Sequence, residues 1–107
     1  MKGVQGGLQQ FIRQANQLQA KAQKLQEELA TREFEASSGG NAVKVTVTGD
    51  SKITKLEISE DVFKSGDREM LQDLVMTAVN EAVKSAKKTG EEEMNKLTGG
   101  MSLPGLF

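Results

Sequence analysis

The chain has 107 residues and a formal net charge of -1, and it contains neither cysteine nor histidine. Their absence excludes disulfides, thiol nucleophiles, imidazole general bases and the usual zinc ligand sets. Hydrophobic residues make up 36% of the chain and aromatic residues 4%, so a single domain of this size has a thin core, and we expect a larger core shared between two copies.

The first seven residues include three glycines and predict a flexible lead-in over residues 1–7. They lack the continuous apolar region of a secretion signal, and no stretch of the chain approaches 18 apolar residues. We therefore expect a soluble cytoplasmic protein with no membrane partner, and the lack of cysteine fits a reducing compartment.

A long amphipathic helix is predicted from about Leu8 to Thr31. Its apolar residues are spaced alternately three and four apart, which is a heptad pattern over three repeats. They are Leu8, Phe11, Ala15, Leu18, Ala22, Leu25 and Leu29. At a rise of ~1.5 Å per residue the helix is roughly 36 Å long, so part of it should project or pack on a partner chain.

The charge is divided along the chain. Residues 1–31 carry four basic and two acidic side chains, whereas acidic side chains are in excess over residues 32–107. Arg13, Lys21 and Lys24 fall on the helix flank away from Leu18 and Leu25. They form either a solubilising face or a ridge that contacts phosphates. A second basic cluster, Lys84, Lys87 and Lys88, is offset by acidic residues 91–93.

Three strands should follow the helix. Residues 32–38 alternate loosely, residues 43–48 alternate clearly between valine and polar residues, and residues 52–58 form the third strand. Turn-forming residues 37–41 and 49–51 separate them, which predicts an antiparallel meander. Ile53 and Thr54 are out of phase with Leu56 and Ile58, which indicates a bulge or a change of register near Thr54.

Two further helical segments are expected. Ser59 is a suitable N-cap for a short turn that ends at Gly66, and Asp67 is a suitable N-cap for a second long helix. The inner face of that helix comprises Leu71, Leu74, Val75, Ala78, Val79, Ala82, Val83 and Ala86. Gly90 either interrupts this helix or is accommodated within it. Residues 99–107, with three glycines and Pro104, predict a flexible tail that is too short to fold alone and that either docks on a groove or is disordered. The order of elements gives one α+β domain over residues 1–107.

Chemical motifs are lacking in the sequence. The acidic runs 27–28 and 91–93 are typical of solvated helix faces, because adjacent helical residues point about 100° apart. No phosphate-binding glycine loop occurs. We expect no enzymatic activity, cofactor, metal or small-molecule substrate.

Four segments together resemble the YbaB/EbfC family of bacterial nucleoid-associated proteins. In chain order they are GGLQQFIRQANQLQAKAQKLQEELA, NAVKVTVTGDSKITKLEIS, DREMLQDLVMTAVNEAVKSA and GGMSLPGLF. The resemblance implies a tweezers-like homodimer whose paired sheets form the body and whose long helices project as arms. It also implies binding of duplex DNA by those helices in the nucleoid, with an influence on nucleoid organisation and gene expression.

The resemblance assigns DNA contacts to the basic residues of both long helices. They are Lys2, Arg13, Lys21, Lys24, Lys84, Lys87 and Lys88. With few arginines among them, we expect contacts to the phosphate backbone and low sequence specificity. The alternative is a helical protein–protein interaction module, in which the apolar seam of the first helix binds a partner and the charges only keep it soluble.

Overall fold

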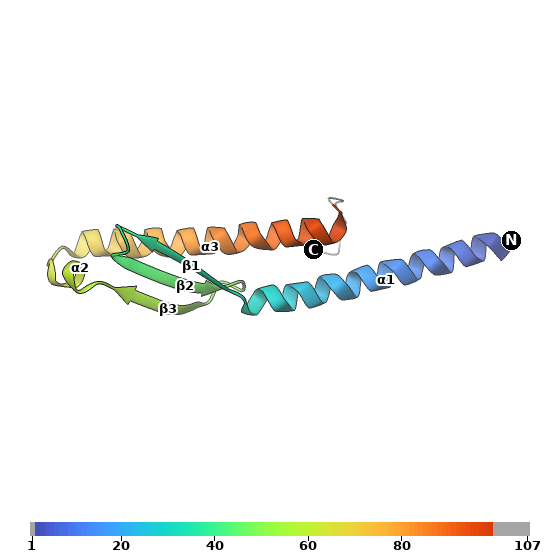
Figure 1. Cartoon of the computed structure of the whole chain (residues 1–107), viewed down its shortest axis with the longest axis horizontal. Coiled ribbons are helices and arrows are strands. Elements are labelled where there is room, and N and C mark those ends of the chain that lie inside the picture. The colour runs from blue at the N-terminus through green and yellow to red at the C-terminus, as the bar shows by residue number, and fades with distance from the viewer. Residues whose placement is uncertain (1, 100–107) are drawn as a thin grey trace.

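The computed structural model describes residues 2–99, with side chains from residue 6 onward. The elements follow one another as α1 (Lys2–Thr31), β1 (Glu33–Ser38), β2 (Val43–Thr48), β3 (Ile53–Ile58), α2 (Glu60–Lys64) and α3 (Arg68–Thr98). Helix α3 lies along the sheet and α1 extends away from it (Figure 1). The predicted α+β class and element order are confirmed.

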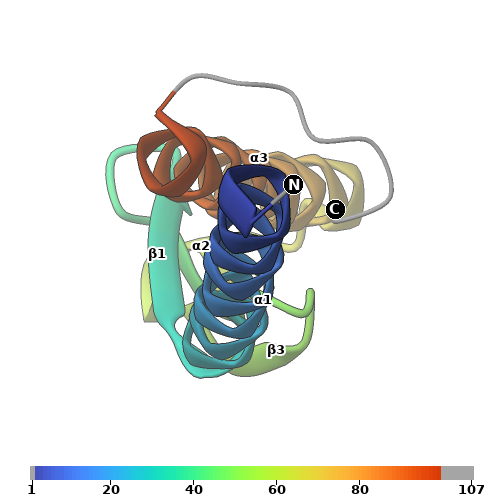
Figure 2. The same ribbon diagram turned by 90° about the vertical axis from the view of Figure 1, so that its right-hand side faces the viewer.

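The molecule is a rod. Its principal extents are 78 × 19 × 18 Å and its radius of gyration is 20.9 Å, against about 13 Å for a compact domain of 100 residues. The length comes from α1, whose N-terminal part continues beyond the sheet and beyond the end of α3 (Figure 1). Figure 2 looks along the rod from that end, with the N-terminal part of α1 in front. The expected projection of the first helix is therefore present.

Helix α1 begins at Lys2, so the predicted start at Leu8 was wrong. Each glycine in a helix costs about 1 kcal/mol relative to alanine, so the three glycines of residues 1–7 favoured a flexible segment over a helix. No proline interrupts the backbone hydrogen bonds there, and adding a turn to a helix that already exists is far easier than starting one. Residues 2–7 therefore continue the helix. Residues 1 and 100–107, which include most of the predicted tail, lie outside the described residues.

The three strands form an antiparallel sheet in the order β1-β2-β3. Thr46 pairs with Lys55 and Val47 pairs with Ile53, which leaves Thr54 as the extra residue of a bulge. This confirms the predicted irregularity and has a physical reason: the bulge returns Ile53 to the same face as Leu56 and Ile58.

The core lies between the sheet and α3. Val43, Val45 and Val47 are fully buried against a row of alanines on the helix, Ala78, Ala82 and Ala86. The larger residues of the predicted inner face pack around this row and are partly buried. Because alanine is small, the helix approaches the sheet closely enough for the Ser38 hydroxyl to donate a 2.6 Å hydrogen bond to the Leu74 carbonyl.

The predicted helix caps are confirmed. The Ser59 side chain accepts from the Val62 amide at 3.3 Å, and the Asp67 carboxylate accepts from the Met70 amide at 3.0 Å. Helix α3 passes through Gly90 without a break. It ends at Gly99, whose φ of 66° is the left-handed conformation that glycine adopts without strain.

Candidate nucleic-acid interface

The turn between β2 and β3 holds the C-terminal end of α1. The Gly49 amide donates to the Arg32 carbonyl at 3.0 Å, and the Asp50 amide donates to the Ala30 carbonyl at 3.3 Å. These bonds occupy backbone carbonyls that a helix end otherwise leaves unpaired. They fix the C-terminal end of α1 to the sheet, while the N-terminal half of the helix projects (Figure 1).

The apolar seam of α1 is covered along half of its length. Ala22 is 3% exposed, and Leu18, Leu25 and Leu29 are half-buried, where α1 packs on α3 and the end of the sheet. Leu8 and Phe11 are 58% and 68% exposed. The difference arises because α3 ends alongside the middle of α1, and nothing described covers the seam beyond that point (Figure 1).

The basic residues of α1 lie outside the seam: Arg13 and Lys24 are on the opposite side of the helix, and Lys21 lies on the flank beside Leu18 and Leu25, which corrects its predicted place away from them. Arg13, Lys21 and Lys24 are all exposed. None of them takes part in an ion pair within residues 6–99, where the ion pairs involve other side chains, Lys52, Lys55, Lys64 and Lys96. No acidic residue precedes Glu27 in the helix. This part of α1 therefore presents cations to the solvent without local neutralisation. The side chain of Lys2 lies outside the described ones.

The basic cluster of α3 has a different environment. Lys84, Lys87 and Lys88 are exposed on the face opposite the buried alanines. Glu91 follows Lys87 by four residues, on the same face of the helix, and so lowers the local positive potential. The α3 cluster is thus a weaker attractor for an anion than the α1 residues.

The structure does not bring the two basic clusters together. The seam of α1 faces α3, so Arg13 and Lys24 point away from α3 and Lys21 lies to one side. The α3 lysines point away from the sheet, in the opposite general direction.

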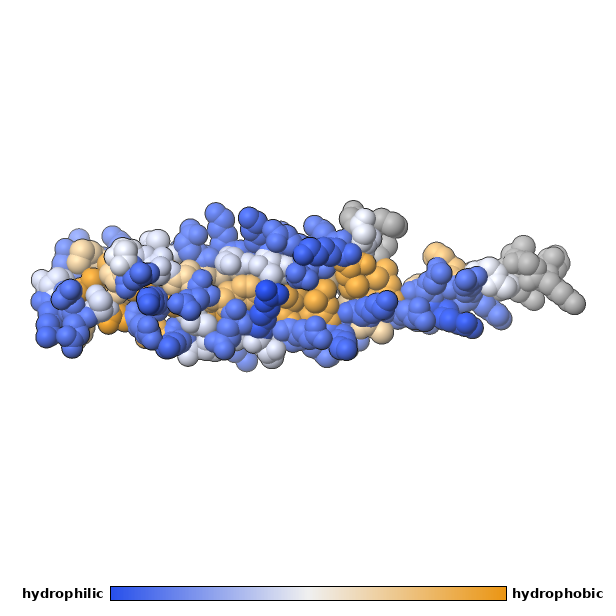
Figure 3. Space-filling model, viewed as in Figure 1, coloured by the Kyte–Doolittle hydropathy of each residue, from blue (hydrophilic) through white to orange (hydrophobic). Residues whose placement is uncertain are grey.

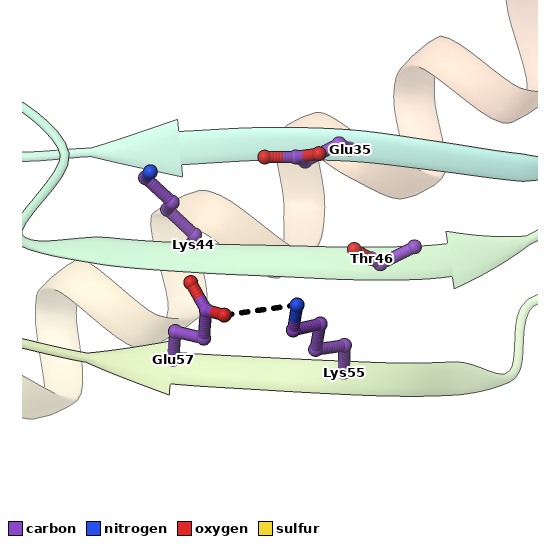
Figure 4. A pocket seen from close by; sticks show the side chains of 5 residues that line it. All are labelled: Glu35, Lys44, Thr46, Lys55 and Glu57. Atoms are coloured by element: carbon purple, nitrogen blue, oxygen red, sulfur yellow. Dashed lines mark ion pairs between the residues drawn. The ribbon is translucent and has the colours of Figure 1, made fainter.

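A further set of charges, which the sequence reading missed, covers the outer face of the sheet. Glu35, Lys44, Thr46, Lys55 and Glu57 line a shallow depression there, and Lys55 Nζ lies 3.0 Å from Glu57 Oε1 (Figure 4). That contact lowers the pKa of Glu57 and raises the pKa of Lys55. Charges of both signs alternate, so this face offers no net attraction to a polyanion. The period-two spacing of the charges along the strands was the available signal.

Other kinds of site are not indicated by the described part of the chain. No group of three or more metal-ligating side chains occurs within it. None of its helices is long and apolar enough to cross a membrane.

Comparison with known proteins assigns the chain to a family. Residues 5–101 match the YbaB/EbfC DNA-binding family, and the chain belongs to that family. A nucleoid-associated protein of Clostridium acetobutylicum is 44% identical over 101 residues, which cover 94% of this chain and 90% of the relative. A nucleoid-associated protein of Clostridium novyi is 44% identical over 107 residues, covering 98% and 94% of the two chains.

The fold has a counterpart among solved structures. The crystal structure of an uncharacterized protein from Helicobacter pylori is similar with a TM-score of 0.71 at 21% sequence identity. The match covers 85% of this chain and 96% of that one. The helix-sheet-helix arrangement is therefore shared with a distant sequence.

Proposed function

We propose that this protein is a nucleoid-associated, homodimeric DNA-binding protein that contacts duplex DNA mainly through phosphates, using α1 of each subunit as an arm. The observation that carries the proposal is the row of exposed, unpaired cations on a projecting helix, in a member of a DNA-binding family. Nucleoid association in the cytoplasm, and an influence on nucleoid organisation and gene expression, follow from that binding.

The dimensions of the arm suit a run of phosphates. Arg13 and Lys24 are eleven residues apart, or about 17 Å along the helix axis. Successive phosphates of one DNA strand are separated by about 3.4 Å along the duplex axis, so this row spans roughly five base-pair steps. Lysine is a point charge that suits phosphate, whereas reading a base edge favours a bidentate side chain. One arginine among three cations therefore favours low sequence specificity.

The dimer is inferred from the uncovered inner face of β3. Val43, Val45 and Val47 pair with Ile58, Leu56 and Ile53, and all six side chains share one face of the sheet. The valines are fully buried, but their β3 partners are 37–54% exposed, because α3 packs on β1 and β2 and leaves β3 at the edge. Figure 3 shows the hydrophobic atoms as a band along the long axis. A second copy packed on this band would supply the missing cover.

Pairing also has a consequence for affinity. Three lysine or arginine contacts from a single arm give weak binding at physiological salt. Two linked arms make the second contact intramolecular, which raises affinity without any new kind of interaction. We therefore expect DNA affinity and dimerisation to be lost together.

The test is a titration of duplex DNA at several salt concentrations, on protein whose mass has been measured by light scattering. With three or four phosphate contacts per subunit, the logarithm of the association constant should fall against the logarithm of salt concentration with a slope of about -6. Random-sequence and defined duplexes should bind similarly. A slope near zero, or a monomer that binds as tightly, would contradict the proposal.

The exposed Leu8 and Phe11 favour a second candidate, a module whose seam binds a helix of another protein. Apolar contacts of that kind are insensitive to salt. A stable protein partner, together with the absence of any salt-dependent DNA shift, would support this candidate over the first.

A further inference from the structure

The N-terminal half of the α1 seam is an unpartnered apolar surface. Leu8, Phe11 and the adjacent Ile12 are 49–68% exposed, and they continue the same helix face that α3 covers at Ala22. Three large apolar side chains grouped on one exposed stripe are unfavourable in water, so a surface of this kind generally has an occupant. The proposed DNA contacts do not use it, because Arg13 and Lys24 lie on the other side of the helix and Lys21 lies beside the covered half of the seam.

The chain contains a segment whose chemistry and position suit this surface. Residues 100–107 include no charged side chain and four large apolar ones, Met101, Leu103, Leu106 and Phe107. They follow Gly99, where α3 ends in a left-handed cap alongside the middle of α1 (Figure 1). The segment therefore starts at the point where α3 stops covering the seam.

The length of the segment also suits this surface. Leu8 lies ten residues before Leu18, or about 15 Å along the helix axis. Eight extended residues reach up to about 26 Å, which exceeds that span. A segment attached beside the seam also has a high effective concentration there, in contrast to a partner that must diffuse to it.

We propose that residues 100–107 bind along the α1 seam of their own chain, over Leu8, Phe11 and Ala15, and so extend the cover that α3 provides. The uncharged segment shields the apolar side of the arm and leaves Arg13, Lys21 and Lys24 exposed. Binding of this segment does not depend on the proposed DNA contacts.

Disulfide trapping tests the proposal directly, because the chain has no cysteine of its own. The test variant is Ala15→Cys with Ser102→Cys, and the matched control is Gln17→Cys with Ser102→Cys. Ala15 and Gln17 are both exposed and differ by about 3 Å along the helix, but they lie on opposite sides of it. Both changes in the test variant are small, and Ala15 lies outside the core.

Under mild oxidation, the Ala15→Cys pair should close at least about tenfold faster than the control, as a bond within one chain on a non-reducing gel. Mixing the two single variants should give little covalent dimer. Equal closure rates for the two pairs would overturn the proposal. Bonds formed between chains in preference to bonds within one chain would assign the seam to a second copy and overturn it as well.

Discussion

Gly49 lies directly against the backbone of Leu29, where the turn between β2 and β3 meets the last turn of α1. A Cβ atom added to Gly49 would overlap the Leu29 carbonyl oxygen and would lie 2.7 Å from the carbonyl carbon. The contact is between two backbones, so no side chain can move to relieve it. The direction in which the arm leaves the sheet is set at this joint.

Gly49→Ala should therefore destabilise the fold by about 1–3 kcal/mol, as overpacking against a rigid neighbour does. Urea unfolding at one fixed protein concentration measures the change. The control is Gly90→Ala, because an added Cβ meets nothing within 4 Å at this helical position. That variant should be about 1 kcal/mol more stable than the original chain. Equal effects of the two changes would show that the joint is not tight.

The basic residues of α1 should dominate DNA affinity. Replacing Arg13, Lys21 and Lys24 by alanine removes up to six phosphate contacts from a dimer, and the slope of log K against log salt should become shallower by about 5. Circular dichroism should remain unchanged, since all three side chains are exposed.

The matched control removes the same number of charges from α3. Replacing Lys84, Lys87 and Lys88 by alanine should change the salt slope much less, because Glu91 already offsets them and they face away from the arm's basic side. If the two triple variants lose affinity equally, the arm is not the principal contact.

The inner face of β3 should hold the dimer together. Leu56→Asp places a charge in the middle of the exposed apolar face, and burying that charge on association is costly. Light scattering should show a monomer, with DNA affinity greatly reduced. Ser51→Asp adds the same charge in the neighbouring turn, at a φ of 66° that aspartate tolerates, and should remain a dimer. A Leu56→Asp dimer would place the interface elsewhere.

The Asp50 carboxyl group, in the turn between β2 and β3, should show a lowered pKa that can be measured. The Thr48 hydroxyl donates to the Asp50 carboxylate, and this bond, with the charge of Lys52, lowers the pKa of Asp50 below the ordinary value of 3.8. A lowered carboxyl pKa stabilises the folded state at pH values above 3.8, and the stabilisation disappears as pH falls through the folded-state pKa. Thr48→Val should raise the pKa of Asp50, as followed by NMR titration of the carboxyl carbon. An unchanged value would assign the shift to Lys52.

Local sequence patterns were sufficient to predict most of the helices and strands. The alternation of Val43, Val45 and Val47, the out-of-phase Ile53 and the caps at Ser59 and Asp67 each depend on residues a few positions apart, and the structure confirms each of them. The predicted start of α1 was wrong, because the low helix propensity of the glycines is outweighed by the long helix that continues through residues 2–7. The site residues and the pairing of chains remain predictions.

The surroundings of a side chain could not be predicted from such local patterns, because they depend on where other helices and strands end. The heptad pattern of α1 is uniform from Leu8 to Leu29, yet only its second half is covered, since α3 stops midway along it. The sequence places a basic cluster on each long helix, but only the packing of α1 on α3 decides that the two clusters lie apart. Periodicity along one helix is fixed by its own residues, whereas cover and direction are fixed by neighbours distant in the chain. The sequence by itself therefore determined the helices, the strands and the seam, and only the tertiary structure decided which of their faces remain open to a partner.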